Sequence, residues 1–145
     1  YATIHSGAYE REIFKWGKKV EVHSVPCPLF VPLAEEGWLD RPATFEIARE
    51  YLLPLKAKRI DVLILVCTHY PVLRDTIRLV MGECVTLVDS GLICAEFVRD
   101  SEPGRTGDGG RVEYFVSDMP ERFREIGRLF MGEEIKDVHL VSPGD

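Results

Sequence analysis

A short polar segment directly follows the most apolar run of the sequence, and it carries the residues best suited to chemistry. Residues 62–66 have the composition of a buried parallel strand, and Cys67, Thr68 and His69 come next, before Pro71 opens a helical pattern. Ligands of open α/β sheets bind beyond the carboxyl ends of the strands. A helix N-terminus stabilises a thiolate and suits a carboxylate. Thr68 adds a hydroxyl and His69 an imidazole. The segment therefore predicts a thiol-based site for an anionic substrate.

Other thiol chemistries fit the sequence less well. The four cysteines are too widely spaced for a paired zinc or redox motif, and free thiols persist in a reducing cytosol. Phosphatases of the cysteine class place an arginine after five intervening residues, whereas Arg74 follows Cys67 after six. A cysteine after a buried strand can also be a simple packing residue. We favour that role for Cys27, and we expect Cys84 and Cys94 to be inert.

Strand and helix patterns alternate along the chain. The expected elements are, in order, a helix over 8–17 capped by Ser6 and ended by Gly17, a strand over 20–25, a proline-broken apolar loop over 26–37, a helix from Asp40 to about Leu55 with Pro42 in its first turn, a strand over 61–66, a helix from Pro71 to Gly82, a strand over 85–88, a helix over 92–99, a flexible segment over 101–110, a strand over 112–116, a helix over 118–132 and a strand over 138–141. This alternation predicts an α/β fold with a doubly wound, mostly parallel sheet.

Composition limits the class of protein. The chain has 145 residues, of which 46% are hydrophobic and 29% charged, as in ordinary globular domains. A net charge of -6 with interleaved acids and bases predicts neither nucleic-acid nor membrane-surface binding. No apolar run approaches the roughly 20 residues of a bilayer span, and no signal peptide is evident, so we expect a cytoplasmic location. The chain opens on Tyr1 close to a helix start, and we expect it to begin within a longer sequence.

Four segments, in the same order, resemble the glutamate racemases of the aspartate/glutamate racemase superfamily. Residues 65–73 resemble their Leu-Gly-Cys-Thr-His-Tyr-Pro stretch, although Val66 stands where the family has glycine. Residues 6–9 resemble their Ser-Gly-Ala-Tyr turn, and 27–37 their Cys-Pro-Leu-Phe-Val-Pro segment. Residues 88–90 resemble the strand end before their last helices. Aspartate racemases usually carry an acidic residue after Cys-Thr, so the histidine here favours glutamate.

The resemblance implies an isomerase that interconverts L- and D-glutamate without a metal or other cofactor. In this family two cysteines flank the α-carbon; one thiolate removes the α-proton, and the other thiol delivers a proton to the opposite face. Cys67 matches the second of these cysteines, and Thr68 and His69 match substrate-contacting positions. His69 and Glu35 match polar groups that assist proton transfer at this thiol, with Glu36 as the alternate. The resemblance also implies a homodimer that supplies D-glutamate for peptidoglycan synthesis, and hence for cell wall biogenesis and cell shape.

One family motif has no counterpart in the chain. The first cysteine of the pair lies in a Cys-Asn-Thr motif, which is absent here, and Asp89 with Ser90 belongs to a different segment from the family's Asp-Ser substrate contact. We therefore expect the C-terminal portion of a two-domain, pseudo-symmetric racemase. Residues 1–91 would form most of the second domain, without its first strand, and 92–145 would return to complete the first domain. The alternatives are a non-catalytic binding or interaction module of this family, an aspartate racemase, or a decarboxylase with a single cysteine.

Overall fold

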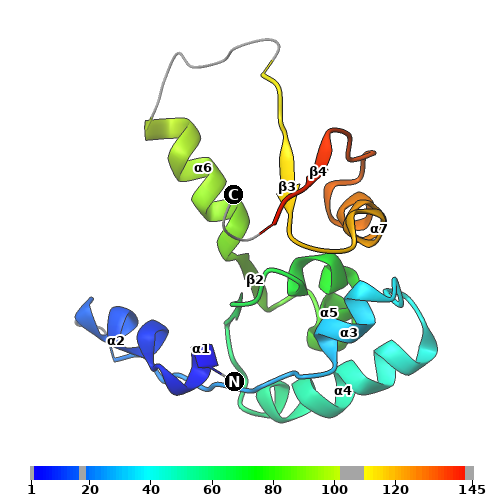
Figure 1. The fold of residues 1–145 in the computed structure, drawn as a ribbon. Coiled ribbons are helices and arrows are strands. Elements are labelled where there is room, and N and C mark those ends of the chain that lie inside the picture. Colours follow the sequence, from blue (N-terminus) through cyan, green and yellow to red (C-terminus); the bar gives the residue numbers. More distant parts are fainter. Residues whose placement is uncertain (1, 17–18, 102–109, 143–145) are drawn as a thin grey trace.

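The computed structural model describes residues 2–16, 19–101 and 110–142, in which helices alternate with short strands (Figure 1). The elements are α1 (Ala2–His5), α2 (Ala8–Lys15), α3 (Phe30–Glu35), α4 (Pro42–Ala57), β1 (Val62–Leu65), the 3-10 helix η1 (Tyr70–Leu73), α5 (Arg74–Met81), β2 (Thr86–Asp89), α6 (Ser90–Ser101), β3 (Tyr114–Val116), α7 (Pro120–Met131) and β4 (Val138–Leu140). None of these helices is long and apolar enough to cross a membrane.

The strands form two parallel pairs. β1 pairs with β2, with Val62 opposite Thr86, and β3 pairs with β4, with Tyr114 opposite Val138. Each pair is connected through helices, because parallel strands cannot be joined by a tight turn. The expected α/β class with parallel strands is confirmed. Within the described residues the strands form two separate sheets of two strands each.

The hydrophobic core is drawn from one stretch of the chain. The buried apolar side chains of the described residues all lie between Cys27 and Leu87, and α4 packs against α5 at their centre. Two buried threonines donate hydrogen bonds to backbone carbonyls, Thr44 to Trp38 at 2.6 Å and Thr76 to Leu39 at 2.7 Å. Their polar groups are thereby satisfied, as burial requires. This core is the scaffold on which β1 and the segment after it are held.

The C-terminal elements are far less buried. Neither α6 nor α7 has a buried residue, and α6 projects away from the core in Figure 1. Phe97 of α6 is 72% exposed and Phe115 of β3 is 63% exposed. Tyr114, Phe123 and Phe130 are partly buried. These aromatic side chains beyond Leu92 form apolar surface of the kind that marks a contact site.

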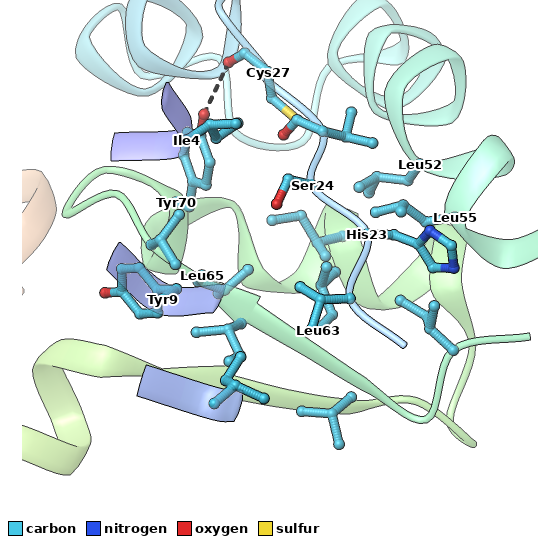
Figure 2. Close-up of a pocket in the computed structure, with 18 of the residues that line it drawn as sticks. Ile4, Tyr9, His23, Ser24, Cys27, Leu52, Leu55, Leu63, Leu65 and Tyr70 are labelled. Carbon is cyan, nitrogen blue, oxygen red and sulfur yellow. Dashed lines mark hydrogen bonds between the residues drawn. The ribbon is translucent and has the colours of Figure 1, made fainter. Parts of the chain in front are cut away.

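The predicted strand over 20–25 is wrong. This segment has no assigned strand, and no strand of the described residues pairs with it. A cavity of about 210 Å³ lies between it and β1 (Figure 2), lined on one side by Val20, Val22 and Ser24 and on the other by Val62 and Ile64. Alternating side chains alone do not make a strand, because a strand also needs a neighbour for its backbone hydrogen bonds.

The predicted first helix over 8–17 is α2, and a separate short helix that the sequence does not predict, α1, precedes it. Gly7, at φ 58°, adopts a left-handed conformation between α1 and α2 that glycine tolerates well. Gly7 rather than the predicted Ser6 is the N-cap of α2, without a capping side chain, although the Ser6 hydroxyl accepts a bond from the Ala8 N–H at 3.3 Å. The helix ends at Lys15. Gly17, the predicted end, lies outside the described residues, as does most of the predicted flexible segment.

Other element ends differ by a residue or two. The proline-broken loop contains the six-residue helix α3, where Pro32 falls in the first turn and no N–H is needed. Arg41 rather than Asp40 precedes α4, and Met119 rather than Asp118 precedes α7, in neither case with a capping side chain. At α6 the Asp89 carboxylate accepts bonds from two backbone N–H groups, at 2.9 and 3.2 Å, which starts that helix earlier than predicted.

Candidate active site

The candidate thiol lies on the turn that leaves β1. Leu65 anchors the end of the strand in the core, and Cys67 follows as a half-buried residue. The Tyr70 N–H donates to the Cys67 carbonyl at 3.1 Å, which closes the turn into η1. The helix predicted to open at Pro71 begins there as the 3-10 helix η1, and α-helical geometry follows only from Arg74, so Cys67 does not lie at the N-terminus of an α-helix.

A row of polar groups runs from Cys67 to α3. The Cys67 Sγ lies 3.9 Å from Nδ1 of His69, and Nε2 of His69 lies 3.1 Å from a carboxylate oxygen of Glu35. The hydroxyl of Thr68 is 3.3 Å from the same Nδ1. The structure thus brings together all four residues that the sequence singles out, although Glu35 and His69 are 34 positions apart.

The carboxylate determines which imidazole nitrogen carries the proton. An ionised carboxylate only accepts hydrogen bonds, so Nε2 of His69 donates to Glu35. In the neutral ring Nδ1 is then the acceptor, and it faces the Cys67 thiol and the Thr68 hydroxyl. Such a row can take a proton from the thiol and return it, with the carboxylate stabilising the imidazolium that forms in between.

The neighbouring carboxylate, Glu36, turns to a different partner. Its Oε1 accepts a bond from Nη2 of Arg122 at 2.8 Å. Glu35 rather than Glu36 therefore contacts His69 in this structure.

Aromatic groups fix the surroundings of the row. Phe130 of α7 meets the His69 ring edge to face, with ring centroids 5.2 Å apart. The Tyr70 hydroxyl donates to the Cys27 carbonyl at 3.1 Å, and its ring packs edge to face on the buried Phe30. Burial, followed by repulsion from Cys27 and Cys67 when these are ionised, raises the pKa of Tyr70 to about 12. Tyr70 is therefore a neutral hydrogen-bond donor rather than an acid–base group.

Three contacts of the site have no signature in the sequence. Ser90 at the start of α6 donates to the Leu65 carbonyl at 3.3 Å, which ties the end of β1 to the next helix. Arg122 and Phe130 reach the site from α7, far along the chain. A helical pattern shows that α7 has two faces but does not say what each face covers.

The large cavity is separate from the candidate site. Figure 2 shows it beside β1, with Leu63 and Leu65 at one wall and Cys27, Leu52 and Tyr70 around it. Its lining includes none of Cys67, Thr68, His69 and Glu35. Within the described residues, no three His, Cys, Asp or Glu side chains lie close enough together to hold a metal ion.

Cys27 is a buried packing residue, and its burial predicts a pH dependence of stability. Desolvation raises its pKa from 9.0 to about 12 in the folded chain, so unfolding at alkaline pH releases a proton. Its contribution to stability is complete below pH 9.0 and is lost as the pH rises toward 12. We expect the urea midpoint to fall over this range, and to fall less steeply in Cys27→Ala, which lacks the thiol. Parallel declines in the two proteins would contradict the assignment.

The chain is an α/β domain with parallel βαβ units. A thiol and a histidine–carboxylate pair lie beyond the carboxyl end of β1, where α/β proteins bind their ligands. Comparisons with known proteins identify the related family. The chain is 45% identical over 146 residues to the glutamate racemase of Chlorobaculum parvum and 46% identical over 145 residues to that of Geobacter metallireducens, covering 97% of this chain and 54% of each relative. No family model matches the chain.

Solved structures agree with these relatives. A glutamate racemase from Francisella tularensis, in complex with D-glutamate, superposes with a TM-score of 0.83 at 34% identity, covering 97% of this chain and 54% of that one. The Thermus thermophilus enzyme, in complex with β-chloro-D-alanine, gives 0.77 at 35% identity, covering 97% and 53%. The chain is therefore a homologue of the glutamate racemases, as its motifs indicate. It spans about half the length of the curated relatives it matches.

Proposed function

We propose that this chain supplies the Cys67 half of the active site of a glutamate racemase. The observation that carries the proposal is the row Cys67–His69–Glu35, found in a chain homologous to glutamate racemases. In one direction the Cys67 thiolate takes the α-proton of one enantiomer, and a second thiol gives a proton to the opposite face of the carbanion. In the reverse direction the two thiols exchange roles, so each proton removed is matched by one delivered.

The remaining groups have roles that follow from this chemistry. His69 accepts at Nδ1 the proton that Cys67 loses when it becomes the base, and Glu35 stabilises the imidazolium that forms. Thr68, which is exposed beside His69, would bind substrate together with that residue. We assign the second thiol to the part of the relatives that this chain does not span, since Cys27 is enclosed by the core and neither Cys84 nor Cys94 belongs to the row. No cofactor enters this proton balance.

The biological setting belongs to the same proposal. Residues 1–91 are proposed to form most of the second domain, and 92–145 to complete the first domain in a homodimeric, cytoplasmic enzyme. Its product, D-glutamate, would enter peptidoglycan synthesis. The four cysteines, all free thiols, suit a reducing compartment.

A chimera tests the proposal directly. Residues 1–145 replace the matching portion of the Geobacter metallireducens racemase, and circular dichroism follows the conversion of each enantiomer of glutamate and of aspartate. We expect conversion of glutamate in both directions. Conversion of aspartate alone would indicate an aspartate racemase, and a folded chimera that binds glutamate without converting it would indicate a binding module.

Replacement of His69 by asparagine in the chimera should affect the two directions unequally. If His69 serves only Cys67, the direction in which Cys67 is the base should lose about 100-fold in turnover number, and the other direction less. The overall equilibrium fixes the ratio of the two kcat/KM values, so the asymmetry appears in kcat and KM separately. Steady-state kinetics in both directions measure it, with His139→Asn as the control. Equal losses in every parameter would mean that His69 only binds substrate or supports the fold.

A further inference from the structure

The C-terminal helix α7 holds the end of α3 that carries Glu35. Arg122 of α7 donates from Nη2 to the backbone carbonyl of Glu35 at 3.0 Å and to the side chain of Glu36 at 2.8 Å. Its Nη1 donates to Glu125 at 3.3 Å on the same helix. A guanidinium suits this task, since its planar donors can serve several acceptors at once. Helix C-termini leave carbonyls unpaired, and Arg122 satisfies one of them.

Two further contacts place α7 against the same turn (Figure 1). A methyl group added at Gly37 would lie 3.3 Å from a methyl carbon of Leu129, so the helix approaches the residue that ends the turn after α3. Phe130 covers the His69 ring. α7 therefore contacts two of the three members of the row, Glu35 through its backbone and the central His69 through its ring.

We propose that Arg122 is a positioning residue, whose guanidinium holds the end of α3 so that the Glu35 carboxylate stays on Nε2 of His69. This inference rests on the proposed function for its role in racemisation, but the geometry it concerns exists in the chain itself. Glu35 is 42% exposed at its side chain, so water competes for the carboxylate unless its backbone is held in place. With Glu35 in place, Nδ1 of His69 remains the proton acceptor that faces Cys67.

The charged neighbours of the pair come from three elements. Glu36 directly follows the last residue of α3, and Cys67 lies on the turn after β1. Arg122 and Glu125 come from α7. Glu36 and Glu125 both bind Arg122 and so neutralise its charge locally. The effect of Arg122 on Cys67 is thus expected to pass through the position of Glu35 rather than through long-range charge.

The reactivity of Cys67 toward iodoacetamide reports on this arrangement. Only the thiolate is alkylated, so the rate follows how readily the thiol transfers its proton to His69. In a Cys84→Ser, Cys94→Ser background of residues 1–145, the exposed thiols are gone and Cys27 is buried. We expect Arg122→Met to slow alkylation of Cys67 about five-fold at neutral pH, the effect of one lost hydrogen bond. The pH profile should shift toward that of His69→Asn.

Two other variants make the outcome decisive. Arg124→Met removes an arginine of the same helix that bonds to Glu121 and to the Val138 carbonyl, and it should leave the profile unchanged. Arg122→Lys keeps the charge with fewer donors, and its rate of Cys67 alkylation should lie between the rates of the parent and of Arg122→Met. If urea denaturation shows that Arg122→Met is unfolded, the rate of Arg122→Lys tests the proposal instead. A folded Arg122→Met, or failing that Arg122→Lys, with the parent profile would overturn the proposal. Because alkylation needs no racemisation, failure of the chimera would leave this result standing on its own.

Discussion

Serine in place of Cys67 is expected to abolish racemisation of glutamate by the chimera in both directions. A hydroxyl is a much weaker acid than a thiol and is seldom an anion near neutral pH. It can therefore neither take the α-proton efficiently nor pass its own proton to Nδ1 of His69, 3.9 Å away from the present sulfur. The loss of an acid–base group of this kind costs about 1,000-fold in rate.

The matched controls are the exposed cysteines. Cys84→Ser and Cys94→Ser change the same functional group at sites outside the row and should retain most of the activity. Circular dichroism of D- and L-glutamate conversion gives the rates, and thermal denaturation shows whether each variant is folded. A Cys67→Ser chimera that racemised near the parent rate would remove Cys67 from the chemistry and leave His69 and Glu35 without a thiol to serve.

Residues 1–145 alone should not racemise glutamate. The proposed reaction needs an acid–base group on each face of the α-carbon, and the described residues of this chain offer one such row. Cys27 is the other cysteine in the segments that resemble the family and would be the alternative second acid–base group. It is buried, and its Sγ is directed at the Val25 carbonyl, 3.8 Å away. Exposed apolar side chains on α6 and β3, among them Phe97 and Phe115, should also make the isolated chain prone to association.

Size-exclusion chromatography followed by the circular dichroism assay on monodisperse protein tests this expectation, with the chimera as the active reference. Sustained racemisation by residues 1–145 that disappears with Cys67→Ala would refute it. The second base would then have to come from Cys27 or from another group of this chain.

Much of the core could be predicted from local patterns, because those patterns report burial directly. The apolar run before Cys67 forms a strand in the structure, and Pro42 and Pro71 lie at the starts of helical segments as expected. The same reasoning fails over 20–25, where alternation is present but the pairing strand is not. Whether a strand forms depends on a neighbour that a local pattern cannot supply.

The candidate site, too, could be predicted from the sequence only in part. Cys67, Thr68 and His69 are adjacent in sequence, so their proximity is readable from it. That Glu35 serves the same thiol as His69 is implied only by the family resemblance, and their direct contact is not predicted, since no spacing rule connects residues 34 positions apart. Arg122 contacts Glu36 across 86 positions, and a surface arginine among several on one helix gives no sign of its partner. Such contacts are set by how α7 docks, which is a property of the whole fold.

The restriction of the core to residues 27–87 has a consequence for the order in which the chain folds. Contacts between elements near one another in sequence close short loops, and these cost less entropy than long ones. The stretch from α3 to β2 can therefore condense first, with α4 against α5 as its centre. The C-terminal elements have no buried side chain among the described residues, so they should open at a lower free energy than the core. Cys67, His69 and Glu35 all belong to the early part, whereas Phe130, which packs on the His69 ring, belongs to the late part, so the row should gain this aromatic cover only when α7 docks.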